Sequence, residues 1–189
     1  STVLHEGARR LSWVAMLALI LTIWWPVGAL RQLSRGERTG MVLGTLAALL
    51  AVSALKSTSR TSCPWDLTEF GGAAHYVTHW ALGVTDGGGG RCFPAGHASA
   101  GFAFIAGYFW LRDKAPGVAR LWLLCVVVAG LTLGFAQQLR GAHFMSHTLW
   151  TAWVCWTTAA LTWSLQQTIT QRVSQRDDLS PLFKPHGKS

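Results

Sequence analysis

The sequence predicts an all-α integral membrane protein built as a bundle of about five transmembrane helices. Half of its 189 residues are hydrophobic and only 13% are charged, whereas a soluble domain of this length carries about 25% charged residues. The apolar residues are gathered in five blocks, each in or near the length of roughly 17–25 residues with which a helix crosses a bilayer. Tryptophans near the ends of these blocks, such as Trp24, Trp110 and Trp150, fit the aromatic belts of membrane interfaces.

The five blocks follow one another along most of the chain, at 11–30, 41–55, 97–111, 119–136 and 147–165. The second and third are short, and a short apolar run can also be a buried core helix. Five such runs in one small chain favour membrane helices. We therefore expect a single transmembrane catalytic domain over 1–168, followed by a polar cytoplasmic tail over 169–189.

The basic residues predict the orientation of the bundle. Most of them fall in the 31–38 turn, the 112–120 turn and the C-terminal tail, which the helix count places on one side, the cytoplasmic side by the positive-inside rule. The N-terminus and the segments 56–93 and 137–147 then face outward. Because this places a chain that begins without methionine outside, we expect a missing N-terminal helix or signal segment, which would make six helices if it is a helix. Topology explains most of the net charge of +8, so no nucleic-acid partner is expected.

The outward segment holds two of the four cysteines, Cys63 and Cys92, one at each end. A disulfide is permitted outside the cytoplasm and would tie the ends of the segment together, but the sequence leaves this pairing open. Because such a bond needs an oxidising compartment, we expect a bacterial inner membrane protein whose outward face is periplasmic. The other two cysteines, Cys125 and Cys155, lie in apolar blocks and are interpreted as small hydrophobic residues.

Several basic residues of the outward segment could bind an anion. Lys56 and Arg60 are four residues apart and would share a face of a continuing helix, as a phosphate site or as plain solvated surface. His75 and His79 have a metal-binding spacing, but the carboxylate of the usual zinc motif is absent. We therefore expect no metal and no cofactor.

A second candidate group follows Arg91, where Pro94, Ala95 and Gly96 form a tight turn before His97. Backbone N–H groups at the start of the following helix would be unsatisfied and would favour an anion. His97 could donate a proton to a leaving oxygen there. The alternative is a polar residue that only caps a membrane helix.

A third group comprises Gln137, Arg140, His143 and His147, whose spacing predicts one helical face. Polar groups at the end of a membrane segment are costly unless they face protein or a water-filled cavity, which favours a functional role. A histidine attacks best when it is neutral and held in one tautomer. His147 is placed to hold His143 in this way, although the two could also be a structural hydrogen-bonded pair.

In this order the groups resemble the type 2 phosphatidic acid phosphatase superfamily of membrane lipid phosphatases, relatives of the vanadium haloperoxidases. That family carries the motifs Lys-x6-Arg-Pro, Pro-Ser-Gly-His and Ser-Arg-x5-His-x3-Asp. This chain has the corresponding segments Lys56-x6-Cys63-Pro64, Pro94-Ala95-Gly96-His97 and Ala136-Gln137-x5-His143-x3-His147. The resemblance spans about 51–163.

The resemblance implies that His143 attacks phosphorus, that His97 protonates the leaving group and that Lys56 binds phosphate. His147 stands where the family has the aspartate that orients the nucleophile. Cys63 and Gln137 replace the two phosphate-binding arginines, Ala95 replaces a serine and Ala136 replaces another. We expect Arg140, together with Arg60 or Arg91, to substitute for the lost arginines.

The resemblance also implies a function. We expect a metal-independent phosphatase that releases phosphate from a lipid phosphate or diphosphate at the periplasmic face, through a phosphohistidine. Its partners would be the bilayer and its lipid substrate, without an obligate protein partner. Undecaprenyl pyrophosphate, phosphatidylglycerophosphate, phosphatidic acid and a lipid A phosphate are all candidates. The alternatives are a phosphotransferase, for example from undecaprenyl pyrophosphate to lipid A, and a non-catalytic protein that binds or transports lipid phosphates.

Overall fold

The computed structural model describes residues 2–78, 80–81 and 83–179, and this part of the chain contains no β-strand. The all-α prediction is confirmed. Within the described residues there are six α-helices, and four short 3-10 turns, η1 to η4, lie between the first four of them. The α-helices are α1 (Thr2–Leu21), α2 (Arg35–Thr58), α3 (Gly96–Phe102), α4 (Ala106–Leu111), α5 (Pro116–Gln138) and α6 (Met145–Leu179).

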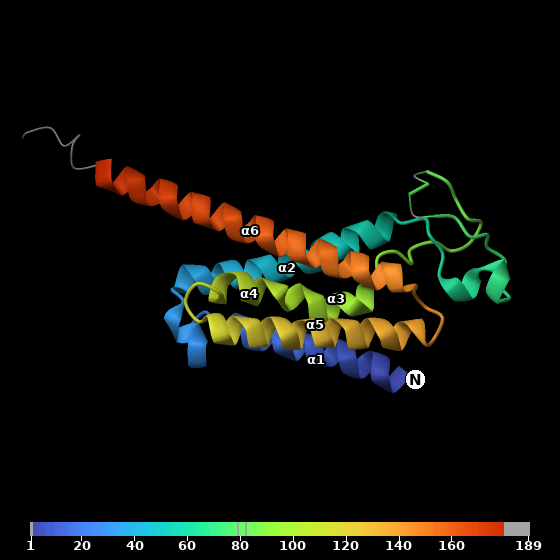
Figure 1. Ribbon diagram of the computed structural model, residues 1–189, viewed down its shortest axis with the longest axis horizontal. Coiled ribbons are helices and arrows are strands. Elements are labelled where there is room, and N and C mark those ends of the chain that lie inside the picture. Colours follow the sequence, from blue (N-terminus) through green and yellow to red (C-terminus); the bar gives the residue numbers. More distant parts are fainter. Residues whose placement is uncertain (1, 79, 82, 180–189) are drawn as a thin grey trace, which may run out of the picture.

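The helices form an elongated bundle around a central rod, defined here as α3, η4 (Ala103–Ile105) and α4 (Figure 1). The central rod packs against α2, α5 and α6, while α1 packs against α2 and α3. The segment 59–95, called the outer segment below, extends beyond one end of the bundle, and α1 begins at that same end. At the opposite end α6 projects well past its neighbours.

The exposed surfaces of the bundle are apolar. Two helices, α2 and α5, are long and apolar enough to cross a membrane, and 10–21 forms a shorter apolar helix. Large side chains such as Leu121 and Leu124 of α5 and Leu161 of α6 are about 60% exposed. Hydrophobic surface of this extent is typical of a membrane or protein contact. That five helices cross the membrane stays a prediction.

The first apolar block is divided, unlike the continuous helix expected over 11–30. Helix α1 ends at Leu21 and a turn leads to Pro26, which has no N–H group and cannot continue a helix. The turn is held by the buried Arg38, whose guanidinium donates to the carbonyl oxygens of Ile23 (3.2 Å), Leu30 and Leu33. These bonds tie the turn after α1 and the end of η1 (Gly28–Gln32) to α2.

The last helix is longer than the apolar block that predicts it. The polar tail was expected to begin at 169, and α6 continues without interruption to Leu179, so the first part of that range is helical. The remaining residues of the tail, 180–189, lie outside the described residues.

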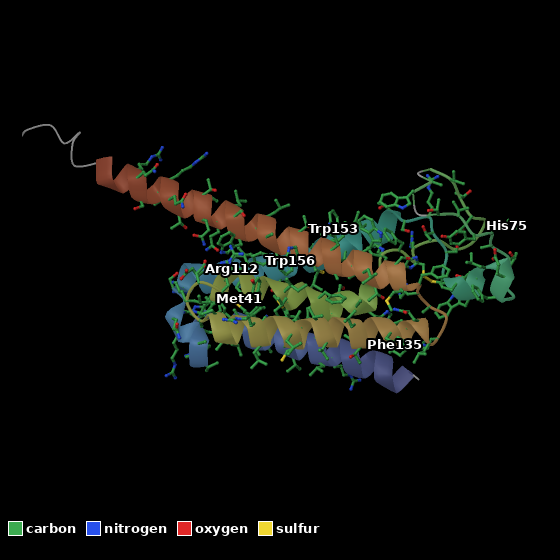
Figure 2. The ribbon with its side chains drawn as sticks, viewed as in Figure 1. Met41, His75, Arg112, Phe135, Trp153 and Trp156 are labelled. Carbon is green, nitrogen blue, oxygen red and sulfur yellow. A yellow bond between two sulfur atoms is a disulfide. The ribbon has the colours of Figure 1, made fainter. Side chains whose placement is uncertain are left out.

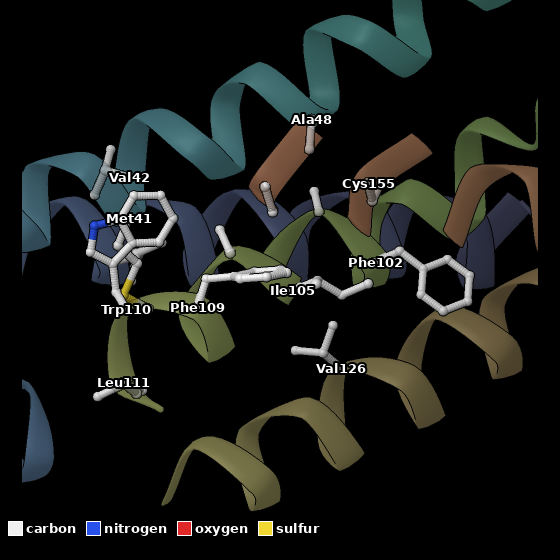
Figure 3. Close-up of a cluster of buried hydrophobic side chains, with 14 of the residues drawn as sticks. Met41, Val42, Ala48, Phe102, Ile105, Phe109, Trp110, Leu111, Val126 and Cys155 are labelled. Atoms are coloured by element: carbon white, nitrogen blue, oxygen red, sulfur yellow. The ribbon is translucent and has the colours of Figure 1, made fainter. Parts of the chain in front are cut away.

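Large side chains of the central rod fill the core between the helices. Phe102, Ile105, Phe109 and Trp110 point toward residues of α2, α5 and α6 (Figure 3). The helices approach closely where one of them carries glycine. A Cβ at Gly101 of α3 would lie 2.5 Å from the backbone nitrogen of Gly130 in α5, so these backbones are in direct contact.

This contact predicts the effect of adding one methyl group. Gly101→Ala would meet backbone that cannot rotate away, so we expect it to destabilise the protein by about 1–3 kcal/mol, as overpacked cores do. The control is Gly117→Ala at the start of α5, where a Cβ meets nothing within 4 Å. Thermal unfolding in detergent should show a lower midpoint for Gly101→Ala alone, and equal midpoints would contradict the close contact.

Candidate functional site

The outer segment is organised around one buried carboxylate, Asp86. Its oxygens accept hydrogen bonds from the Ser62 amide (2.5 Å), the Ser62 hydroxyl (2.9 Å) and the Gly88 amide (3.0 Å). Burial raises the pKa of Asp86, but these bonds outweigh it, so that the pKa lies below its usual value. Asp86 therefore stays ionised and ties the far part of the outer segment to the residues that follow α2.

A disulfide joins Cys63 to Cys92, with Cα atoms 5.1 Å apart. The sequence left this pairing open. Beside it, the amide of Arg91 donates to the Ser59 oxygen at 2.8 Å, and that of Cys92 to the Thr61 oxygen at 2.9 Å. The disulfide and these bonds bring the end of α2 next to the start of the central rod.

Lys56, in the last turn of α2, lies against the start of α3. Its ammonium donates to the carbonyl oxygen of Arg91 at 2.6 Å. A Cβ at Gly96 would lie 3.3 Å from Cδ of Lys56, so the missing side chain of this glycine gives the lysine room to pass. The residues of the first and second motifs are thus in contact.

The third motif does not lie on one helical face, and that prediction is wrong. Helix α5 ends at Gln138, and Gly141 adopts the left-handed conformation (φ 69°) before His143 is reached. The backbone amide of Ala142 donates to the backbone oxygen of Gln137 (2.9 Å), and the amide of Gly141 donates to the backbone oxygen of Gln138 (2.8 Å). This is the pattern of a Schellman cap. A glycine just after the last apolar turn is a known signal of a helix end, and it was present in the sequence.

His143 and His147 nevertheless meet across this corner. Their Nδ1 atoms are 3.4 Å apart, and the two side chains are only 5% and 2% exposed. At this distance one Nδ1 donates a hydrogen bond and the other accepts it, which fixes the tautomers of both rings. The ring of His147 is enclosed by Phe93 and Phe144, with ring centroids at 5.3 and 5.5 Å.

The first turn of α6 is also bonded to the second motif. The amide of Ala95 donates to the carbonyl oxygen of His147 at 3.3 Å. The hydroxyl of Thr151 donates to the carbonyl oxygens of both Ala95 (3.1 Å) and His147 (2.8 Å). At Ala95, where the family motif has serine, it is the backbone that makes these contacts.

The surroundings of His143 keep its imidazole neutral. Its pKa is lowered to about 3 by burial first, then by the positive charge of Lys56 and by repulsion from His147 and His97 when these rings are protonated, while a backbone hydrogen bond with Cys92 raises it. The ring centroid of His97 lies 6.4 Å from that of His143. Four predicted site residues, Lys56, His97, His143 and His147, are therefore brought together at one end of the bundle.

The arginines expected to substitute for the missing ones differ in their surroundings. The guanidinium of Arg60 donates to the Gly83 oxygen at 3.0 Å, and that of Arg140 donates to the Gln137 side-chain oxygen at 3.2 Å. The exposed Arg91 guanidinium has no hydrogen bond or ion pair in the described part of the chain. Of these three, Arg91 is therefore the one available to an anion without breaking a contact.

The described residues include one cluster of possible metal ligands, although the sequence predicted no metal. Cys92, His143 and His147 offer ligand atoms that lie within 4.8 Å of one another, but the sulfur of Cys92 is held in the disulfide and is not a thiolate. His75 is exposed and lies at the far end of the outer segment (Figure 2), and its sequence partner His79 lies outside the described residues.

A family model described as the PAP2 superfamily matches residues 38–171, which is more than half of the chain. The matched range contains most of α2, the outer segment, the central rod, the whole of α5 and most of α6. No match to the chain was found among curated proteins or among solved structures.

The lowered pKa of His143 predicts how the stability of the fold depends on pH. An unfolded histidine takes up its proton near pH 6.5, whereas folded His143 does so only near 3. Above about pH 6.5 this histidine is neutral in both the folded and the unfolded protein, so it causes no change of stability with pH. As the pH falls from about 6.5 toward 3, the unfolded protein takes up the proton and the folded protein does not, so the free energy of unfolding decreases. We expect the melting temperature in detergent to fall between pH 7.5 and pH 4.5, and to fall less in His143→Gln. The control is His75→Gln, which should fall as the wild type does; an unchanged pH dependence in His143→Gln would contradict the assignment.

Proposed function

The chain belongs to the PAP2 superfamily, whose members are generally phosphatases, and we propose that it is a metal-independent phosphatase of lipid phosphates or diphosphates. The observation that carries this proposal is the contact of His143 with His147 at 3.4 Å beside Lys56 and His97. A neutral histidine with one nitrogen held by an acceptor has a lone pair available on the other.

In the proposed reaction the first step is attack by Nε2 of His143 on phosphorus. The N–P bond forms as the bond between phosphorus and the leaving oxygen breaks, and His97 gives that oxygen a proton. The Nδ1–H of His143 donates to Nδ1 of His147, which stabilises the positive charge that the ring acquires. In the second step His97 removes a proton from water, the water oxygen attacks phosphorus, and phosphate leaves the restored His143.

Phosphate binding is assigned to Lys56 and Arg91. The Lys56 ammonium is 2.6 Å from the Arg91 carbonyl oxygen, so the two residues lie together at the start of α3. Fixed positive charges around the transferred group stabilise the negative charge of its oxygens, which is the main catalytic contribution in phosphoryl transfer. Arg140, held by Gln137, is proposed as a further contact from the α5–α6 corner.

We propose that five helices, counting the central rod as one, cross a bacterial inner membrane, with the site at the periplasmic end. Two apolar helices long enough to span and a largely apolar exposed surface support this arrangement. The disulfide in the outer segment requires an oxidising compartment, as the periplasm is. The substrate phosphate would then enter at headgroup level while its lipid tail stays in the bilayer.

The first test is phosphate release by purified protein in detergent with EDTA. The substrates are undecaprenyl pyrophosphate, phosphatidylglycerophosphate, phosphatidic acid and a lipid A phosphate. We expect His143→Ala to lose all measurable turnover because no other group replaces the nucleophile, and the exposed His75→Ala to keep it. Substantial activity in His143→Ala would exclude the assigned nucleophile.

The products also discriminate between the alternatives. Free phosphate identifies a hydrolase, whereas a phosphorylated acceptor, formed only when lipid A is added, identifies a phosphotransferase. Tight binding of a lipid phosphate that is recovered unaltered after long incubation would identify a non-catalytic binding protein.

The second test compares two arginines of the outer segment. Arg91→Ala should lower kcat/KM by about tenfold to a hundredfold, since a charged hydrogen bond to a phosphate is worth about 1.5–3 kcal/mol. Arg60→Ala should cost much less, because Arg60 is engaged with Gly83. A larger loss in Arg60→Ala than in Arg91→Ala would reverse the assignment.

A further inference from the structure

Three potential metal ligands lie around the candidate nucleophile. Nδ1 of His143 is 3.4 Å from Nδ1 of His147 and 3.5 Å from the sulfur of Cys92. All three side chains are buried. The sulfur is also 2.9 Å from the carbonyl oxygen of Ala142, and a disulfide sulfur carries no hydrogen to donate to it.

Two of the three distances among these atoms are those of a tetrahedral zinc site. Zinc binds sulfur at about 2.3 Å and imidazole nitrogen at about 2.05 Å, which places tetrahedral ligand atoms roughly 3.3 Å apart for two nitrogens and roughly 3.6 Å apart for sulfur and nitrogen. The two contacts made by His143 have these lengths. The ligand atoms of Cys92 and His147 lie within 4.8 Å of each other, so a shift that brings this pair to the tetrahedral distance would place Cys92, His143 and His147 at three corners of one tetrahedron.

The disulfide keeps this site from forming. We propose that opening the Cys63–Cys92 bond creates a zinc site of Cys92, His143 and His147, and that zinc bound there switches the enzyme off. A dithiol reductant supplies the two electrons and two protons that convert the bond to two thiols, and is itself oxidised to a disulfide. Zinc then displaces the proton of the Cys92 thiol. The binding site stands independently of the proposed phosphatase activity, whereas the switch rests on it.

Metal at this position blocks attack through the tautomer of His143. Zinc takes the Nδ1 lone pair, so the proton of the neutral ring must reside on Nε2, the nitrogen that would attack phosphorus. The hydrogen bond to His147 is lost at the same time. The ring stays in place but has no lone pair to offer.

The thiolate supplies the only negative charge among the three ligands. The positive charge of Lys56 acts on His143 and opposes a cation at this position. Two neutral imidazoles alone would then bind zinc weakly. We therefore expect the site of the oxidised protein to stay empty at zinc concentrations that fill the site of the reduced protein.

The test uses two variants that both lack the disulfide and both keep one of its thiols. Cys63→Ser leaves the Cys92 thiol beside the histidines, while the matched control Cys92→Ser leaves the thiol of Cys63. Each full-length protein in detergent is titrated with Zn²⁺, and bound metal is measured after gel filtration. Co²⁺ serves as the spectroscopic probe, because tetrahedral cobalt with a thiolate ligand has intense visible and charge-transfer bands.

We expect Cys63→Ser to bind about one zinc ion per chain more than Cys92→Ser does and to show the tetrahedral cobalt spectrum. Adding His147→Ala to Cys63→Ser should weaken zinc binding by about tenfold or more, because losing even an outer-shell partner of a metal ligand costs about 10–100-fold. Equal zinc uptake by the two cysteine variants would overturn the site. If Cys63→Ser folds poorly, wild type reduced with a phosphine and compared with oxidised wild type decides in the same way.

Activity then separates the switch from the site. The switch requires that zinc inhibit Cys63→Ser and reduced wild type but not oxidised wild type. Zinc that binds to Cys63→Ser without lowering its turnover would overturn the switch and leave the site. Oxidised wild type without activity on any lipid phosphate would refute the proposed function, and the switch with it, while the metal titration would still establish the site.

Discussion

The arrangement of the whole bundle depends on how closely the central rod can approach its neighbours. Gly101 and Gly130 place the backbones of α3 and α5 in direct contact. Gly107 of α4 leaves room for the indole of Trp122, whose N–H donates to the carbonyl oxygen of Phe104 at 2.7 Å. These contacts fix where the first residues of α3 lie within the bundle. They thereby fix the position of His97 relative to the α5–α6 corner. Small residues at the helix contacts therefore also set the geometry of the candidate site.

The site itself is assembled mainly by backbone hydrogen bonds. Carbonyl oxygens of Arg91, Ala95 and His147 accept bonds from a lysine, a threonine and a backbone amide, and these bonds connect three segments that are far apart in the sequence. Backbone contacts of this kind tolerate a change of side chain. The contacts made by the backbone at Ala95 therefore do not require the serine of the family motif.

Much of this could be predicted from the sequence, because hydrophobic blocks and motif spacing are local properties. The blocks located the helices, and the three motif segments identified the family. The end of α1 and the corner at Gly141 were missed, since both depend on single residues that interrupt an otherwise helical pattern. The engagement of Arg60 with Gly83 could not be predicted at all, because it depends on how a long irregular segment folds back on itself.

The replacement of the family aspartate by His147 changes the electrostatic balance of the site. In the family motifs a lysine and two arginines face one carboxylate, which leaves two net positive charges for the substrate. Here both arginines and the carboxylate are gone, and Lys56 alone contributes one positive charge. A carboxylate is ionised near neutral pH, whereas a neutral imidazole orients the nucleophile without any charge. Under the proposed function, Arg91 added to Lys56 restores the two positive charges of the family site, and Arg140 would be a further contact.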